Sequence, residues 1–250
     1  MAQEFSLSRI GQFIRRDLTI HKSTFITGFL VTAVLLFLFC ILNMVWDKQL
    51  GLEEFFGIFG LFYIPMGILF TFSLFKEFND TKSNHLYLSL PISIPERLAA
   101  KWFTVTIIYT VAFSLLAIFV GMLAIAVGTV IFNANFNVLS IFTEHYWNVI
   151  KVYFVIQPIF LVGAITFAKN RIGKTILLLG LLVLGFLLFN FILFAIFNHS
   201  YGVFSGETIG SEAIDKAGED LSVMGKWFYS LLFGPIMLAV AYFKMTEKEV

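Results

Sequence analysis

One stretch of the sequence nearly matches the pattern of a phosphate-binding loop. It runs Ala168-Lys-Asn-Arg-Ile-Gly173-Lys174-Thr175 and departs from that pattern only in its first residue, where alanine replaces glycine. A P-loop binds phosphate through backbone amides that lie between a β-strand and a helix. Here the stretch is basic and joins two long apolar segments. We interpret it as a turn between membrane helices and expect that the chain does not bind nucleotide itself.

The sequence lacks the other common catalytic patterns. It contains no His-Glu-x-x-His metal motif and no Gly-x-Ser-x-Gly nucleophile elbow. Its four histidines have no spacing that metal ligands would require: His21, His85, His145 and His199. We expect no enzymatic activity, no metal or other cofactor and no nucleic-acid partner for this chain.

The composition of the sequence is typical of a membrane protein. The 250 residues are 59% hydrophobic and only 13% charged, and the mean hydropathy is +0.89. A soluble domain has about 25% charged residues, which cover its surface in water. A chain with half that charge is suited to a lipid bilayer and is long enough for a single membrane domain over residues 1–250.

Charged residues divide the chain into six apolar segments. About 20 apolar residues are needed for a helix to cross the hydrocarbon core, and the backbone there must be helical because lipid cannot bond its amides. We therefore predict an all-α, polytopic fold of six transmembrane helices. The predicted spans are residues 24–46, 55–75, 102–127, 149–167, 175–197 and 227–243.

Lysine and arginine are distributed unequally between the two sides of such a bundle. Thirteen of the 17 lie on the side of the N-terminus and of the loop between the second and third spans. Short cytoplasmic loops are enriched in these residues. We therefore expect a multi-pass protein of the cell (inner) membrane with both termini in the cytoplasm.

The residues before the first span have the spacing of an amphipathic helix. Within residues 8–18, apolar side chains recur at helical spacing on one face, and Arg9, Gln12, Arg15 and Arg16 point away from it. This pattern indicates an interfacial helix that lies on membrane lipid. The alternative is a simple basic flank of the first span.

A few polar and small residues lie inside the predicted spans, where they affect how the helices pack. The amides of Asn43, Gln157 and Asn190 require partners in lipid, and we interpret them as interhelical hydrogen-bonding groups, with the lining of a substrate path as the alternative. A stripe of small residues on the third span permits close helix packing: Ala117, Gly121, Ala124 and Gly128.

The loop between the second and third spans has the most specific pattern. Residues 79–88 can form a short helix, which must end by Leu90 because Pro91 disfavours helix in the residue before it. Ser93 and Glu96 then match a capping box and predict a new helix that leads into the third span. A short exposed helix between two spans suits docking of a cytoplasmic partner, although an ordinary loop is the alternative.

This loop resembles that of the permease subunits of ABC-2-type transporters. The resemblance also covers the general layout, with a basic amphipathic start, six spans and a larger outer loop before the last one. Many members of the family have an arginine directly after the serine. This sequence has Ile94 at that position, and its arginine follows three residues later, at Arg97. The residues that carry the resemblance are Glu77, Leu86, Leu90, Pro91, Ile92, Ser93 and Lys101.

The resemblance implies an exporter half that has no nucleotide site of its own. Two permease copies, identical or paralogous, would pair, and each would dock a separate ATP-binding-cassette subunit through residues 79–88 acting as a coupling helix. A non-transporting membrane scaffold and a small secondary carrier are the alternatives. The residues expected at the docking surface are Asn79, Lys82, His85, Leu86, Tyr87, Leu90 and Pro91.

Overall fold

The computed structural model describes residues 5–79, 90–197 and 232–249, and every regular element in these ranges is helical. This confirms the all-α prediction for the described part of the chain. The elements are α1 (Leu7–Ile20), α2 (Lys22–Asp47), α3 (Leu52–Leu74), α4 (Lys76–Asn79), α6 (Ile94–Phe103), the π-helical segment η1 (Thr104–Ile108), α7 (Tyr109–Phe132), α8 (Glu144–Thr166), α9 (Arg171–Phe197) and α11 (Gly234–Glu249).

Among the described residues, five helices are long and apolar enough to cross a membrane. They are α2, α3, the unbroken helix formed by α6, η1 and α7, then α8 and α9. Each contains most of one predicted span, so the first five spans are confirmed as apolar helices of spanning length. The charges that bounded the predicted segments also lie close to the observed helix ends, as Lys22 and Asp47 do for α2.

The sixth predicted span is not established by the described residues. Its first five residues, 227–231, lie outside them. The helix that follows, α11, has 16 residues and continues beyond the predicted end at residue 243 into a charged segment. Because about 20 apolar residues are needed to cross the hydrocarbon core, α11 alone is too short, and a sixth span remains a prediction.

The small-residue stripe on α7 packs against neighbouring helices as predicted. Ala117 and Ala124 are completely buried. A Cβ atom added at Gly128 would collide with the side chain of Met44 on α2, and one added at Gly121 would collide with the ring of Phe55 on α3. The absence of side chains at these two positions therefore allows α7 to approach both helices closely.

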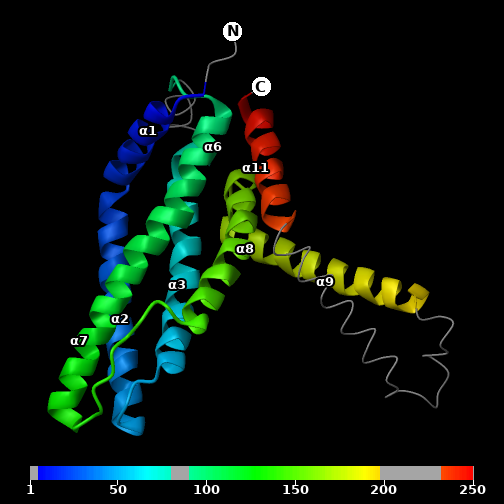
Figure 1. The fold of residues 1–250 in the computed structure, drawn as a ribbon. Coiled ribbons are helices and arrows are strands. Elements are labelled where there is room, and N and C mark those ends of the chain that lie inside the picture. The colour runs from blue at the N-terminus through cyan, green and yellow to red at the C-terminus, as the bar shows by residue number, and fades with distance from the viewer. Residues whose placement is uncertain (1–4, 80–89, 198–231, 250) are drawn as a thin grey trace, which may run out of the picture.

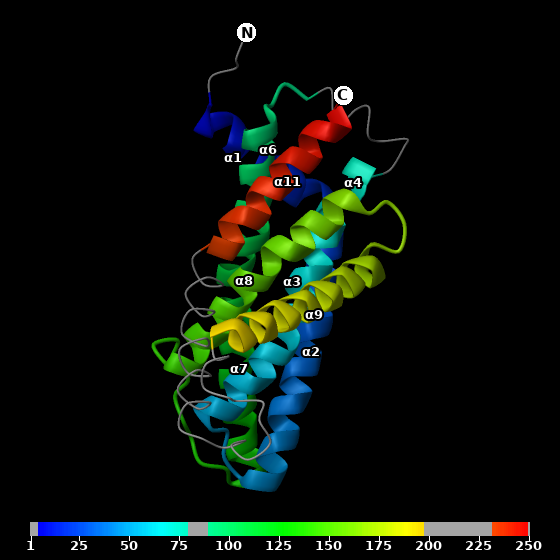
Figure 2. The ribbon, with the colours of Figure 1, turned by 90° about the vertical axis from the view of Figure 1, so that its right-hand side faces the viewer.

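The helices form an elongated bundle with one helix projecting from it. Helices α2, α3 and α7 lie side by side, with α8 and α11 packed beside them (Figures 1 and 2). Helix α9 contacts α8 and extends away from the other helices, with its apolar surface exposed (Figure 1). Helix α1, the start of α6 and the C-terminal end of α11 lie at the same end of the bundle, which we call the α1 end (Figures 1 and 2).

The predicted N-terminal helix is present as α1, but two of its arginines face the protein. Phe13 and Asp17 are buried against the bundle, where α1 packs on α6. Arg9 and Arg16 do not point away, as the amphipathic pattern suggested, because they form ion pairs with carboxylates on α6 and α4. The helix therefore uses its charged side chains for tertiary packing.

Candidate functional site

The predicted docking segment lies at the α1 end, between α4 and α6. Asn79 is the last residue of α4, and Leu90 and Pro91 form a bend shortly before α6 begins. Leu90 is partly buried, whereas Pro91 is exposed. The other predicted docking residues lie outside the described part of the chain, and their helix stays a prediction: Lys82, His85, Leu86 and Tyr87.

The end of this segment that leads into α6 is fixed by the carboxylate of Glu96. This carboxylate accepts hydrogen bonds from the Ser93 amide at 3.0 Å and the Ser93 hydroxyl at 2.8 Å, as the predicted helix cap requires. It also accepts hydrogen bonds from the Arg9 guanidinium at 2.8 Å and the Ser6 amide at 2.6 Å. Glu96 is completely buried, so the start of α6 is held against the N-terminal end of α1.

The other end of the segment is also held by α1. The Arg16 guanidinium donates hydrogen bonds to Glu77 on α4 at 2.9 Å and to Asp17 at 3.1 Å. The Lys101 ammonium on α6 lies 2.7 Å from the Asp17 carboxylate and donates a hydrogen bond to the Leu74 carbonyl of α3 at 2.6 Å. These contacts join α1, α3, α4 and α6 where the docking segment leaves and re-enters the bundle.

We call this group of charged residues the α1 ion-pair cluster: Arg9, Arg16, Asp17, Glu77, Glu96 and Lys101. Burying a charge is costly unless an opposite charge and hydrogen bonds compensate it. Both conditions are met at Lys101, which is completely buried and contacts Asp17, the Leu74 carbonyl and the ring of Phe13. The cluster therefore fixes one arrangement of α1 on α6, because a shifted arrangement would leave buried charges without partners.

His21 connects the cluster to the first span. It lies between α1 and α2 and is only 8% exposed. Burial, together with the positive charge of Lys101, lowers the pKa of the His21 imidazole below its ordinary value, although Asp17 and Glu77 act in the opposite direction. The imidazole therefore favours its neutral form at this position.

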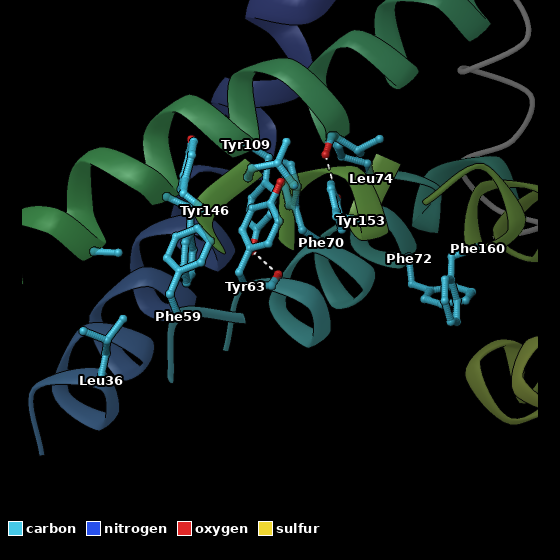
Figure 3. Close-up of a cluster of buried hydrophobic side chains, with 14 of the residues drawn as sticks. Leu36, Phe59, Tyr63, Phe70, Phe72, Leu74, Tyr109, Tyr146, Tyr153 and Phe160 are labelled. Carbon is cyan, nitrogen blue, oxygen red and sulfur yellow. Dashed lines mark hydrogen bonds between the residues drawn. The ribbon is translucent and has the colours of Figure 1, made fainter. Parts of the chain in front are cut away.

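A second polar group lies deeper in the bundle and contains four tyrosines that the sequence analysis did not single out. Tyr63, Tyr109, Tyr146 and Tyr153 come from α3, α7 and α8 and lie together in the buried core (Figure 3). The rings of Tyr63, Tyr109 and Tyr153 contact one another, with centroids 5.3 Å apart for Tyr63 and Tyr109 and 4.7 Å apart for Tyr63 and Tyr153. Tyr146 joins them through Phe59, whose ring contacts both Tyr146 and Tyr63. We call this group the tyrosine cluster. Tyrosines inside apolar spans were the available signal, because a buried hydroxyl needs a hydrogen-bond partner.

The tyrosine hydroxyls bond to the backbone and to neighbouring hydroxyls. Tyr153 donates to the Val105 carbonyl in η1 at 2.8 Å, and Tyr109 donates to the Tyr63 carbonyl at 2.6 Å. The Tyr63 hydroxyl pairs with Thr110 at 2.6 Å. A π-helical turn disturbs the regular backbone ladder and is often found at functional sites. At η1, one of its carbonyls accepts a hydrogen bond from the side chain of another helix.

Gln157 lies one helical turn beyond Tyr153 on α8. Its side chain is buried, with 1% exposure, and neither its amide nitrogen nor its amide oxygen has a hydrogen-bond partner in the described part of the structure. The same holds for the side-chain oxygen of Asn43 on α2. The prediction that these amides bond between helices stays a prediction, because these atoms form no such bond within the described residues. Asn190 is partly buried on α9.

The stretch with the P-loop-like pattern joins two helices. Residues 167–170 connect α8 to α9, and Lys174 and Thr175 lie in the first turns of α9. The Thr175 hydroxyl donates to the Arg171 carbonyl at 2.7 Å and packs against Gly163 of α8. The strand that precedes a phosphate-binding loop is replaced here by α8, so the context supports interpretation as a basic interhelical turn.

The fold and these groups define a multi-pass helical membrane protein with an ion-paired cluster at one end and a polar aromatic cluster within its bundle. No protein family, curated protein sequence or solved structure matches the chain significantly.

Proposed function

We propose that the chain is the permease subunit of an ATP-binding-cassette exporter and is driven by a separate ATP-binding subunit that docks at residues 79–91. The observation that carries this proposal is that both ends of the docking segment are ion-paired to one helix, α1. Arg16 binds Glu77 before the segment, and Arg9 binds Glu96 after it. A segment supported in this way can transmit a force from a bound partner into the bundle.

The route of transmission follows from the unbroken helix α6–η1–α7. Glu96 lies at its start, Lys101 follows in the ion-pair cluster, and Tyr109 lies in the tyrosine cluster. Displacement of the docking segment would therefore act on one continuous element that reaches the interior of the bundle. The hydrogen bond from Tyr153 to Val105 joins η1 to α8. We expect these two helices to separate at this contact when a substrate path opens through the bundle.

The substrate path is proposed to run beside Gln157 and the tyrosine cluster. Buried polar groups in a membrane bundle commonly mark substrate pathways, and the Gln157 amide is available for hydrogen bonding. The exposed apolar surface of α9 offers area for a second permease copy.

Six spans with both termini in the cytoplasm complete the proposal, and reporter fusions at Gly210 and Val250 test that topology. An outward signal at Val250 or an inward one at Gly210 would contradict it.

The docking proposal is tested by co-purification with an ATP-binding-cassette subunit encoded beside this chain. We expect the double variant Leu86→Ala/Tyr87→Ala to lose that subunit, because an apolar anchor at an interface contributes roughly 2 kcal/mol or more, which is about a thirtyfold change in affinity. The variant should still insert into the membrane and pair with a second copy.

The matched control is Val138→Ala/Phe142→Ala, which removes two exposed apolar side chains from the connection between α7 and α8. This connection begins at the end of the bundle away from α1, where α7 ends, and runs to the start of α8 (Figure 1). The control variant should keep the ATP-binding subunit. If the Leu86→Ala/Tyr87→Ala variant also retained it with unchanged ATP hydrolysis, the docking assignment would be wrong and a membrane scaffold would become the better explanation.

A further inference from the structure

A pocket lies between α1 and the bend that precedes α6. Its volume is about 220 Å³. One side is formed by α1 and the other by three consecutive residues of the bend. The lining residues are Arg9, Gln12, Phe13, Arg16, Leu90, Pro91 and Ile92. Two guanidinium groups and an amide therefore surround a pocket whose remaining walls are apolar.

The charges around the pocket favour an anion. Arg9 and Arg16 line it and are each about one-third exposed, so both guanidinium groups are ordered by their carboxylate partners and still reach solvent. The buried Arg97 guanidinium donates a hydrogen bond to the carbonyl of Ile92, which is one of the lining residues. The carboxylates nearby already accept hydrogen bonds from these arginines, Glu77 and Asp17 from Arg16 and Glu96 from Arg9.

The position of the pocket places it near the lipid headgroups. Helix α1 is separated by one residue, His21, from the apolar helix α2, and Ile92 precedes the α6–η1–α7 helix by two residues. Both walls of the pocket thus lead directly into helices of membrane-spanning length. Basic residues on an amphipathic helix at such a boundary attract anionic lipids, and the apolar walls suit the glycerol and first methylenes of the same molecule.

We propose that this pocket binds the headgroup phosphate of an anionic phospholipid. Arg9 and Arg16 contact the phosphate, Gln12 donates a hydrogen bond to the headgroup, and Phe13 and Ile92 contact the apolar part of the lipid. The bound lipid would join α1 to the end of the docking segment and stabilise that end. The site belongs to this chain alone and does not depend on an ATP-binding subunit.

The test uses the full chain purified in a neutral detergent. Mixed micelles containing phosphatidylglycerol are titrated in, and the melting temperature and the number of retained lipids, the latter by native mass spectrometry, are recorded. Phosphatidylcholine with the same acyl chains and inorganic phosphate form the two comparison titrations. We expect phosphatidylglycerol to raise the melting temperature in a manner weakened by salt, and the other two compounds to have little effect.

Two substitutions at Gln12 give opposite expectations. Gln12→Glu places a negative charge in the pocket and should weaken phosphatidylglycerol binding roughly tenfold, whereas Gln12→Lys should strengthen it. Gln12 is exposed, so neither change disturbs a buried contact. The control is Gly11→Glu, which adds the same charge at an exposed position of α1 where a side chain meets open space. Gly11→Glu should bind nearly as the natural chain does.

The outcomes separate the proposal from its rivals. A gain of affinity in Gln12→Lys supports it, because a damaged fold cannot produce tighter binding. Equal stabilisation by phosphatidylcholine, or an effect of inorganic phosphate as large as that of phosphatidylglycerol, would overturn the assignment to an anionic lipid. So would unchanged binding in both Gln12 variants, which would place the lipid elsewhere on the protein.

Discussion

The ammonium group of Lys101 and the carboxylate of Asp17 form a buried ion pair, 2.7 Å apart, between helices that are distant in the sequence. Asp17 belongs to α1 and Lys101 to α6, and neither side chain is more than 2% exposed. Lys101 also bonds the Leu74 carbonyl at the end of α3. The pair thus holds the N-terminal helix to the two spans that flank the docking segment.

Removing one member of this pair should destabilise the protein more than removing both. Lys101→Met removes one of the two cations that contact the buried Asp17 carboxylate, leaves Arg16 as the other, and should lower the free energy of unfolding by about 3 kcal/mol. The double variant Asp17→Leu/Lys101→Met removes both charges and should recover a large part of this loss. Thermal melting in detergent of the two single variants and the double variant measures the coupling. Additive losses would show that the pair does not act as a unit.

A second prediction concerns the pH dependence of stability at His21. Its pKa is lowered from 6.5 by burial and by the charge of Lys101. The unfolded chain therefore binds the imidazole proton at a higher pH than the folded chain does. The resulting contribution to stability is complete above pH 6.5 and is lost as the pH falls through the lower, folded-state pKa.

Melting temperatures recorded from pH 7.5 downward test this contribution. The informative quantity is the difference between the natural chain and His21→Gln, which lacks the imidazole. We expect the natural chain to lose more stability than His21→Gln as the pH falls below 6.5. Parallel curves for the two proteins would show that the imidazole titrates as it does in the unfolded chain.

The spans and the start of α6 could be predicted from the sequence because their signals are local. Charges such as Lys22 and Asp47 stop an apolar run wherever the run packs, and the Ser93–Glu96 cap involves residues three apart. The partner of Arg9 could not be predicted in this way, because Glu96 is 87 residues distant. Positive charge near a membrane predicts a side of the bilayer, and it does not distinguish an arginine in water from one in an ion pair.

The tyrosine cluster could not be predicted for a related reason. Helical spacing places Tyr146, Tyr153 and Gln157 on one face of α8, but it does not say which helix that face meets. The contacts with Tyr63 and η1 depend on how α3, α7 and α8 pack. The sequence identifies the polar residues of the spans. Whether they have hydrogen-bond partners in the described structure depends on how the helices pack, which the sequence alone does not show.

A third prediction concerns the close approach of α3 to α8. A Cβ atom added at Gly67 would lie 2.5 Å from a ring carbon of Tyr153, within a fully buried contact. Gly67→Ala should therefore destabilise the protein by about 1–3 kcal/mol through overpacking. Gly57→Ala, on an exposed part of the same helix with nothing within 4 Å, is the control and should be neutral or slightly stabilising. Comparable melting temperatures for the two variants would contradict the packing described for Tyr153.

The last prediction concerns the amide of Gln157. A buried polar group without a partner costs about 1–3 kcal/mol relative to a group that needs none. Gln157→Leu keeps a side chain of similar size and removes both unpartnered atoms, so it should raise the free energy of unfolding by roughly 1–2 kcal/mol. The measurement is thermal melting in detergent, with Asn190→Leu on the partly buried face of α9 as the control for a general gain in apolar character.

The direction of the change decides between the two interpretations of Gln157. If its amide is retained for a substrate path, the Leu variant should be more stable and should lose the stimulation of ATP hydrolysis in a complex reconstituted with the ATP-binding subunit. If the amide instead bonds another helix, the same substitution breaks that bond and lowers the melting temperature. A less stable Gln157→Leu variant would therefore support the interhelical hydrogen bond predicted from the sequence and would contradict a substrate path beside the tyrosine cluster.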